Sequence, residues 1–428
     1  MLFFILLLLV LLLIVQAKSN ISIILRKVLS FLAGLFRVIF TFLLILVLYY
    51  FDEIEKWINN KKKGKKAFIS LPICSSISYA WTMGSTLGLI YIIQVISGVL
   101  LACHYNPSVE GAFSSLQEVT REVPNGWFLR TIHANGASAF FFAVYVHIGR
   151  SLYYGGFFNK PVWLSGILIL VVMMAIAFLG YVLPWGQMSF WGATVITSFF
   201  SSIPYVGNTL TMWIWGGYSV GGPTLVRFYA LHFLLPFVLG GLIVLHIWLL
   251  HKEGSSNPLN SFINSCKIPF GPYFTRKDIL IFICLWWLLS FIVTYHPWIF
   301  GESDNFIKAS LLVTPEHIVP EWYFLFAYAI LRCIPNKSAG LSGLVLSIAV
   351  LSILPLMKTI QTEGSTFFPL SKFVFWTMIS NFTLLTWLGA CEVEWPYVSM
   401  AQACSFYYFF YFVFVSPFVR KTEYNILF

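Results

Sequence analysis

Charged residues are scarce in this sequence of 428 residues, of which Asp, Glu, Lys and Arg together make up only 10%. A soluble domain carries about a quarter of its residues as charged side chains, so a water-soluble globule is excluded. Hydrophobic residues make up 59% of the chain, and the mean hydropathy is +0.83. The composition therefore indicates a protein whose main solvent is lipid.

Cysteine is also sparse and irregularly placed. The seven cysteines form neither a Cys-x-x-Cys pair nor a Cys-x-x-Cys-His motif. The sequence therefore predicts no zinc site, no disulfide framework and no covalently attached c-type heme.

Eight apolar runs are long enough to cross a bilayer, which takes roughly 20 residues. Open sheet edges cannot face hydrocarbon, and the runs show no alternation of polar and apolar residues, so we expect helices. The predicted fold class is all-α: a polytopic membrane helix bundle with eight core transmembrane helices. The runs cover residues 83–103, 130–150, 162–184, 225–250, 279–296, 339–357, 370–390 and 396–418.

An N-terminal extension precedes this core. Two apolar stretches, residues 2–16 and about 28–51, are followed by a Lys-rich run that ends at Lys66. The first stretch is also compatible with a signal peptide, but it lacks a basic start and a clear small-residue cleavage site, so we favour retained helices. The predicted domains are the hydrophobic extension (1–66), a four-helix N-terminal half (67–260) and a four-helix C-terminal half (261–428).

The formal net charge of +10 follows the connections between the apolar runs. If the Lys-rich run lies on the positive side, the loops on that side hold 16 Lys or Arg residues from Lys56 onward, and the opposite side holds six. This asymmetry obeys the positive-inside rule. The second and fourth core helices then run parallel, from the less positive (outer) side to the positive (inner) side. We interpret the charge as topology and predict no binding to nucleic acid.

Four histidines lie inside the predicted spans as two pairs. His133 and His147 lie on the second helix, and His232 and His246 on the fourth, each pair fourteen residues apart. Fourteen residues return a helix to within roughly 40° of one face, about 21 Å further along. On parallel helices His133 therefore meets His232, and His147 meets His246. A single histidine inside a span could equally well be a core residue or part of a proton relay as a heme ligand. Two matched pairs favour two bis-histidine hemes, which carry electrons.

Glycines repeat at the same interval. Gly84 and Gly98 in the first helix, and Gly166 and Gly180 in the third, are also fourteen residues apart. A porphyrin edge pressed between helices needs a missing side chain at its own level, so these glycines fit two stacked hemes. The alternative is that they serve helix packing only.

Two arginines flank the histidines of the second helix. Arg130 lies three residues before His133, and Arg150 lies three residues after His147. Each could neutralise a heme propionate. The alternative is that each reaches for the lipid headgroups.

Several motifs together resemble those of the cytochrome b family, in the order and spacing of that family, over about residues 70–418. The resemblance implies the cytochrome b subunit of a ubiquinol:cytochrome c oxidoreductase (respiratory complex III). The motifs are HANGAS at 133–138, GYVLPWGQ at 180–187, WGATVI at 191–196, PEWY at 320–323 and ILR at 330–332.

The resemblance implies a quinone cycle coupled to proton translocation, in which two noncovalent b hemes connect an outer site of quinol oxidation with an inner site of quinone reduction. At the outer site Glu321 would accept a proton, with Tyr181, Tyr328, Pro320 and Tyr323 around it. The inner site would be lined by His251, Ser255 and Asp278, because a histidine and a carboxylate can deliver the protons that quinone reduction requires.

The resemblance also implies partners and a location. Partners would be the Rieske iron–sulfur protein, cytochrome c1 and further complex III subunits, in a homodimeric complex within the bilayer. The Phe-rich, charge-poor composition and the absence of an Arg/Ser-rich transit peptide favour the mitochondrial inner membrane, with a bacterial plasma membrane as the alternative.

Three other functions compete with this interpretation. A chloroplast-type relative would be split into two chains and carry an additional heme on a cysteine. A small di-heme anchor of a dehydrogenase would need neither the PEWY motif nor the last three spans. A proton-coupled transporter would favour discontinuous helices and an internal repeat, neither of which is evident in the sequence.

Overall fold

The computed structural model describes residues 70–259, 266–356 and 364–427. Contacts divide the chain into two units, one of residues 1–71 with 270–276 and the other of residues 72–269 with 277–428. Of the first unit only residues 70, 71 and 270–276 are described. The predicted N-terminal helices, like the alternative of a signal peptide, lie outside the described residues.

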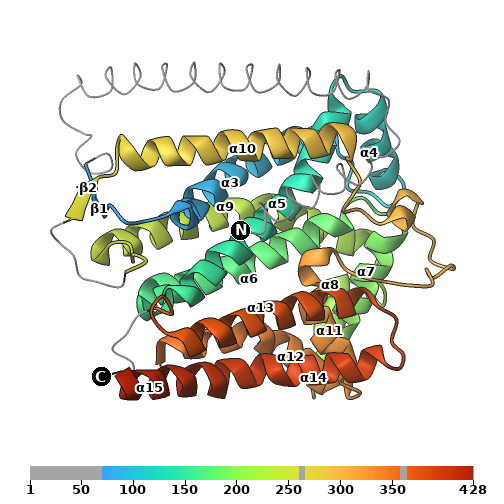
Figure 1. Cartoon of the computed structure of the whole chain (residues 1–428). Coiled ribbons are helices and arrows are strands. Elements are labelled where there is room, and N and C mark those ends of the chain that lie inside the picture. The colour runs from blue at the N-terminus through green and yellow to red at the C-terminus, as the bar shows by residue number, and fades with distance from the viewer. Residues whose placement is uncertain (1–69, 260–265, 357–363, 428) are drawn as a thin grey trace, which may run out of the picture. The chain divides into compact units, whose positions relative to one another are not determined.

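The described chain is mostly helical (Figure 1). The longest helices are α3 (Met83–Ala102), α5 (Gly126–Tyr153), α6 (Lys160–Val182), α9 (Gly222–Glu253), α10 (Tyr273–Tyr295) and α13 (Pro369–Ala390). Shorter helices are α4 (Ala112–Arg121), α7 (Gln187–Ser198), α8 (Gly207–Trp215), α11 (Leu325–Cys333) and α12 (Lys337–Ala349). The C-terminal run is α14 (Tyr397–Phe410), a π-helical turn (Tyr411–Val415) and α15 (Ser416–Leu427).

Short elements connect these helices. Strands β1 (Pro72–Cys74) and β2 (Lys267–Pro269) form one antiparallel pair with Ile73 opposite Ile268. The 3-10 turns are η2 (Tyr79–Thr82), η3 (Gly156–Phe158), η4 (Phe199–Ser202), η6 (Ser303–Phe306), η7 (Trp322–Phe324) and η8 (Val350–Leu356).

Seven described helical runs are long and apolar enough to cross a membrane, which confirms the predicted class of polytopic helix bundle. They are Tyr79–Ala102, Lys160–Val182, Gly222–Glu253, Tyr273–Tyr295, Lys337–Leu356, Pro369–Ala390 and Tyr397–Ile426.

Helix α5 accounts for the difference between these seven runs and the eight expected. It corresponds to the second expected span and is 28 residues long, but it is not among the seven. Polar side chains inside it, including His133, Asn135 and His147, lower its apolarity. The Asn135 amide is buried and donates hydrogen bonds to the carbonyls of Thr131 (2.9 Å) and Pro297 (2.8 Å). A helix can carry polar side chains in lipid when they form hydrogen bonds within the protein, as Asn135 does. Because α5 is not among the seven runs, its role as a membrane span stays a prediction.

Helix pairing places the histidine helices at the centre of the N-terminal half. Helix α3 packs on α5, α6 packs on α9, and α11 packs on α12, α13 and α14. Within the second unit, α4, α7, α8 and the segment between α10 and α11 lie at the right in Figure 1, whereas α9 ends at the left, near the β-strand pair. In the predicted topology the first of these ends would face the outer side and the second the inner side.

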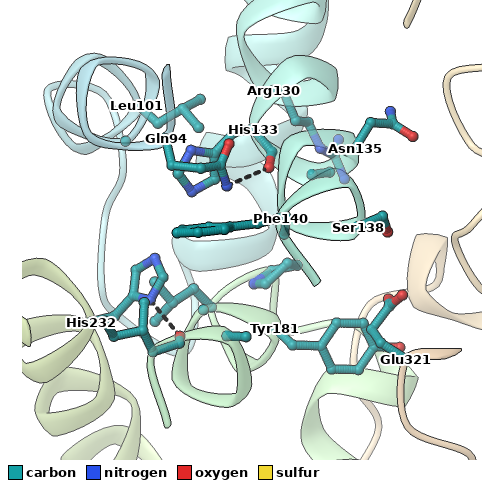
Figure 2. A pocket seen from close by; sticks show the side chains of 18 of the residues that line it. Gln94, Leu101, Arg130, His133, Asn135, Ser138, Phe140, Tyr181, His232 and Glu321 are labelled. Atoms are coloured by element: carbon teal, nitrogen blue, oxygen red, sulfur yellow. Dashed lines mark hydrogen bonds between the residues drawn. The ribbon is translucent and has the colours of Figure 1, made fainter. Parts of the chain in front are cut away.

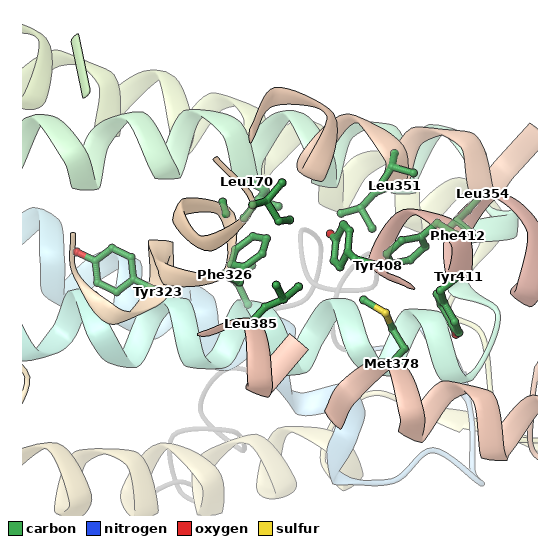
Figure 3. Packing of buried hydrophobic residues seen from close by; sticks show 14 of the residues in the cluster. Leu170, Tyr323, Phe326, Leu351, Leu354, Met378, Leu385, Tyr408, Tyr411 and Phe412 are labelled. Atoms are coloured by element: carbon green, nitrogen blue, oxygen red, sulfur yellow. The ribbon is translucent and has the colours of Figure 1, made fainter. Parts of the chain in front are cut away.

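The main apolar core joins the two halves (Figure 3). Leu170 of α6 packs with Phe326 of α11, Leu385 of α13 and Tyr408 of α14 in one buried cluster. Each of these side chains is less than a tenth exposed, and burying such a side chain stabilises the fold by about 1.5–3 kcal/mol. The core therefore fixes the segment that carries Glu321 against the histidine half.

Candidate functional site

The structure brings the four histidines together in the two predicted pairs. The ring centres of His133 on α5 and His232 on α9 are 6.3 Å apart, and those of His147 and His246 are 6.4 Å apart. The pairs form because the equal intervals of fourteen residues place both levels in register on the two helices.

This spacing is close to that required by one shared metal ion. A metal ion bonds an imidazole nitrogen at about 2 Å, so two rings on opposite sides of one ion have centres roughly 6 Å apart. Within the described residues no group of three or more His, Cys, Asp or Glu side chains is placed to hold a metal ion. A heme requires only two such ligands, because its porphyrin supplies the other nitrogens.

Hydrogen bonds to Nδ1 orient three of the four rings. The Ser97 hydroxyl donates to the Ile93 carbonyl (2.7 Å) and lies 2.8 Å from Nδ1 of His133. The hydroxyl therefore accepts a hydrogen bond from Nδ1–H of His133, and Nε2 of that ring keeps its lone pair free to bind a metal ion. His246 has the same arrangement with the Ser165 hydroxyl at 2.9 Å. Such outer contacts fix the tautomer of a metal-binding histidine.

His232 is also protonated at Nδ1, because its Nδ1 lies 2.8 Å from the Ile176 backbone carbonyl and must donate a hydrogen bond to it. His147 differs. Nη2 of Arg150 lies 3.2 Å from its Nδ1, which accepts that hydrogen bond because a guanidinium can only donate. Nε of Arg150 is buried without a hydrogen-bond partner among the described residues.

Each predicted glycine lies against one of the histidine rings. A Cβ atom at Gly84 would lie 3.6 Å from Cε1 of His147, and one at Gly98 would lie 3.0 Å from Cε1 of His133. On α6, Gly166 faces Cε1 of His246 at 3.3 Å, and a Cβ at Gly180 would overlap the ring of His232. The absence of a side chain at these glycines makes room for the imidazole rings. The sequence alone predicts room for the edge of a porphyrin instead.

A cavity of about 320 Å³ connects the His133 and His232 pair with Glu321 (Figure 2). Gly98, Gly180 and Arg130 also line it. The Arg130 guanidinium donates to the Thr120 hydroxyl (2.9 Å) and lies over the Trp298 ring, 5.0 Å from its centroid. In the described part of the chain it has no carboxylate partner, which leaves its positive charge available to an anion in the cavity.

The segment around Glu321 is fixed by its aromatic neighbours. Trp322 Nε1 donates to the Ser138 hydroxyl of α5 (3.1 Å), and the Tyr323 ring stacks on Phe141 with centroids 4.0 Å apart. The Tyr145 hydroxyl donates to the Tyr323 carbonyl. These contacts hold Glu321 at the edge of the cavity.

Glu321 and Tyr181 lie side by side in Figure 2, and both also line a second, smaller and almost wholly apolar cavity of about 30 Å³ with Pro320 and Tyr328. Burial and, secondarily, the nearby Glu302 carboxylate raise the pKa of the Glu321 carboxyl to about 8. The Tyr181 hydroxyl is buried without a hydrogen-bond partner among the described residues, and the Tyr328 hydroxyl donates to the Ile318 carbonyl (3.0 Å). A carboxyl that titrates near neutrality can exchange protons with a substrate.

The predicted inner-site residues occupy different environments. Asp278 near the start of α10 is buried and approaches Ser85 of α3. His251 at the end of α9 is exposed, and Ser255 is half-buried. The elements that carry them reach the end of the bundle opposite the Glu321 segment (Figure 1). Their joint role in one inner site stays a prediction.

Comparisons with known proteins agree with this geometry. A family model for cytochrome b/b6/petB matches residues 68–254, and one for cytochrome b(C-terminal)/b6/petD matches residues 308–409. A solved structure of a hyperthermophilic respiratory complex III is similar with a TM-score of 0.80 and 30% identity, over 86% of this chain and 99% of that one. Fold and site thus define a multi-pass membrane protein of the electron-transfer class. The chain belongs to the cytochrome b family, which confirms the resemblance carried by its motifs.

Proposed function

We propose that this chain is the cytochrome b subunit of a respiratory ubiquinol:cytochrome c oxidoreductase. It binds one b heme between His133 and His232 and a second between His147 and His246. The observation that carries this proposal is the pair of facing imidazoles at each level, 6.3 and 6.4 Å apart. The similarity to a respiratory complex III favours this function over a transporter or a small di-heme anchor.

When bound, each heme supplies a centre that accepts and donates one electron. The histidines would bind its iron through Nε2. The Ser97 and Ser165 hydroxyls and the Ile176 backbone carbonyl keep three of the four rings in the tautomer that this requires. Arg130 and Arg150 would pair with propionates, a role that their lack of carboxylate partners in the described chain supports.

Quinol oxidation belongs to the outer end. A quinol hydroxyl placed beside Tyr181 and Pro320 would give its proton to the Glu321 carboxylate, which lines both the small cavity and the larger one. The apolar lining of the small cavity excludes water, and the carboxyl pKa of about 8 suits reversible proton transfer. Tyr323, stacked on Phe141, and Tyr328, bound to the Ile318 carbonyl, hold the segment that carries Glu321 in place.

Quinone reduction belongs to the inner end. Asp278 and His251 would donate the two protons that the reduced ring takes up, and Ser255 would orient a quinone carbonyl. Their location at the end opposite Glu321 supports this division. Oxidation outside and reduction inside would couple electron transfer to proton translocation.

The same assignment includes partners and a location. The Rieske iron–sulfur protein would receive the first electron of each quinol, cytochrome c1 would follow it, and other complex III subunits would complete a homodimeric assembly. We propose the mitochondrial inner membrane as the location, with a bacterial plasma membrane as the alternative.

Heme content of the purified complex tests this function. We expect a pyridine hemochrome assay to give two b hemes per chain, and a potentiometric titration of the dithionite-minus-ascorbate difference spectrum to resolve two midpoints. A preparation without heme would exclude the redox function and favour a transporter. One heme per chain would mean that one histidine pair is wrong.

Alanine at Gly98 is expected to lower occupancy of the outer heme, because its Cβ would press on the His133 ring at 3.0 Å. Such overpacking costs about 1–3 kcal/mol. Gly88 on the same helix has no neighbour within 4 Å of its Cβ position, so Gly88→Ala is the matched control and should keep both hemes. Gly180→Ala should be more damaging than Gly98→Ala, since its Cβ would overlap the His232 ring. Equal heme content in the three variants, measured by hemochrome, would show that these glycines do not accommodate the ligands.

A further inference from the structure

Helix α15 carries two buried charges at its centre. Arg420 is 8% exposed and Glu423, one turn further on, is 4% exposed, whereas Lys421 between them is exposed. The helix lies beyond residue 409, where the match to the family models ends. Charged side chains are rarely buried without specific partners, so both require an explanation.

Glu423 caps the N-terminus of α13 from a different helix. Its carboxylate accepts hydrogen bonds from the backbone N–H groups of Leu370 (2.6 Å) and Ser371 (3.0 Å), and from the Ser371 hydroxyl. The residue in the capping position, Phe368, offers no side-chain acceptor of its own. A carboxylate here satisfies unpaired N–H groups and complements the helix dipole.

Arg420 caps the C-terminus of α5 in the same way that Glu423 caps the N-terminus of α13, but as a hydrogen-bond donor. Its guanidinium donates to the Leu152 carbonyl and to the Ser365 hydroxyl, both at 3.1 Å. The Ser365 backbone N–H in turn donates to the Tyr153 carbonyl (2.8 Å). A cation that binds the last carbonyls of a helix stabilises that end.

This end of α5 also contains the inner heme ligand. His147 lies five residues before Leu152. The Ser151 hydroxyl donates to the His147 carbonyl (3.1 Å), and the Arg150 guanidinium donates to its Nδ1 (3.2 Å). Arg420 therefore binds the same last turns of α5 whose Arg150 and Ser151 side chains bind His147.

We propose that Arg420 and Glu423 are positioning residues that clamp the inner end of α5 and so fix His147 for the inner heme. One turn of α15 ties the C-terminus of the histidine helix to the N-terminus of α13. This role rests on the proposed assignment of the inner heme to His147 and His246. The outer pair lies at the other end of α5, so the clamp acts on one heme selectively.

The test compares Arg420→Gln and Glu423→Gln with Lys421→Gln in the assembled complex. Hydrogen–deuterium exchange of peptides covering residues 148–158 should become at least about tenfold faster in Arg420→Gln, the factor expected when a hydrogen bond to a charged group is lost. Glu423→Gln should do the same for residues 368–374. In both variants the midpoint of the inner heme should shift while that of the outer heme stays constant, and Lys421→Gln should match the unsubstituted complex.

Unchanged exchange and unchanged midpoints in Arg420→Gln and Glu423→Gln would overturn the clamp, as would equal changes at both hemes, which indicate general destabilisation. If Arg420→Gln does not assemble, Arg420→Lys, which keeps the charge but lacks the planar fork, carries the same comparison. An unsubstituted complex without heme would instead refute the proposed function, and the exchange data would still report on the clamp.

Discussion

Replacing His246 by leucine is expected to remove the inner heme, to leave the outer heme bound and to reduce quinol:cytochrome c turnover to background. His246 faces His147 at 6.4 Å, and neither contacts the outer pair at the other level. Leucine cannot bind iron, and His147 alone would leave the proposed inner heme with a single protein ligand. In the proposed function, electrons from the outer heme would then have no route to the inner quinone site.

Heme-specific absorption checks this result, because the two proposed hemes are expected to titrate at separate potentials. His104→Leu is a suitable control, since His104 is exposed and lies outside both pairs; it should retain two hemes and normal turnover. Loss of the outer heme in His246→Leu would contradict the pairing by level, and loss of both hemes would mean that the two sites fold as one.

The histidine pairs were predictable because they depend on helix geometry alone. Equal intervals of fourteen residues fix both the face and the level of each ring once the two helices run parallel. The glycines followed from the same interval, but their contacts did not. The sequence suggested space for a porphyrin edge, and the structure places Gly98 and Gly180 directly against imidazole rings.

The residues that orient the rings escaped prediction. Ser97 and Ser165 each precede one of the four glycines, so a repeated Ser-Gly dipeptide was available as a signal. It was incomplete, because Met83 and Leu179 stand in the equivalent positions before the other two glycines. The Ile176 carbonyl that fixes His232 leaves no trace in the sequence at all, since any residue supplies a backbone carbonyl.

Long-range contacts set the other limit. The apolar run predicted to end at residue 418 continues as helix to Leu427, and the burial of Arg420 and Glu423 depends on α5 and α13, which lie far away in sequence. Counting helices predicts that Asp278 and His251 lie at the inner end, and this stays a prediction. Their separate environments depend on loop geometry that hydropathy does not encode.

Glu321→Gln is expected to slow quinol oxidation by about a hundredfold or more, the range for loss of a general base, while both hemes stay bound. Glutamine keeps the size and polarity of the side chain, and neither cavity should change shape. It cannot take a proton from the quinol. Pre-steady-state reduction of the outer heme by quinol gives the rate, and Glu316→Gln, an exposed acid of the same loop, is the matched control that should leave it unchanged.

The pH dependence separates a proton acceptor from a merely structural acid. With its pKa at about 8, the Glu321 carboxyl is mostly protonated at pH 7 and ionised at pH 9, so the rate of the unsubstituted protein should rise through this interval. The negative charge of Glu302 contributes to the raised pKa, so Glu302→Gln should lower it and move the rise to lower pH. Glu321→Gln should lose the rise altogether. Normal turnover of Glu321→Gln across this range would mean that the quinol proton leaves by another group.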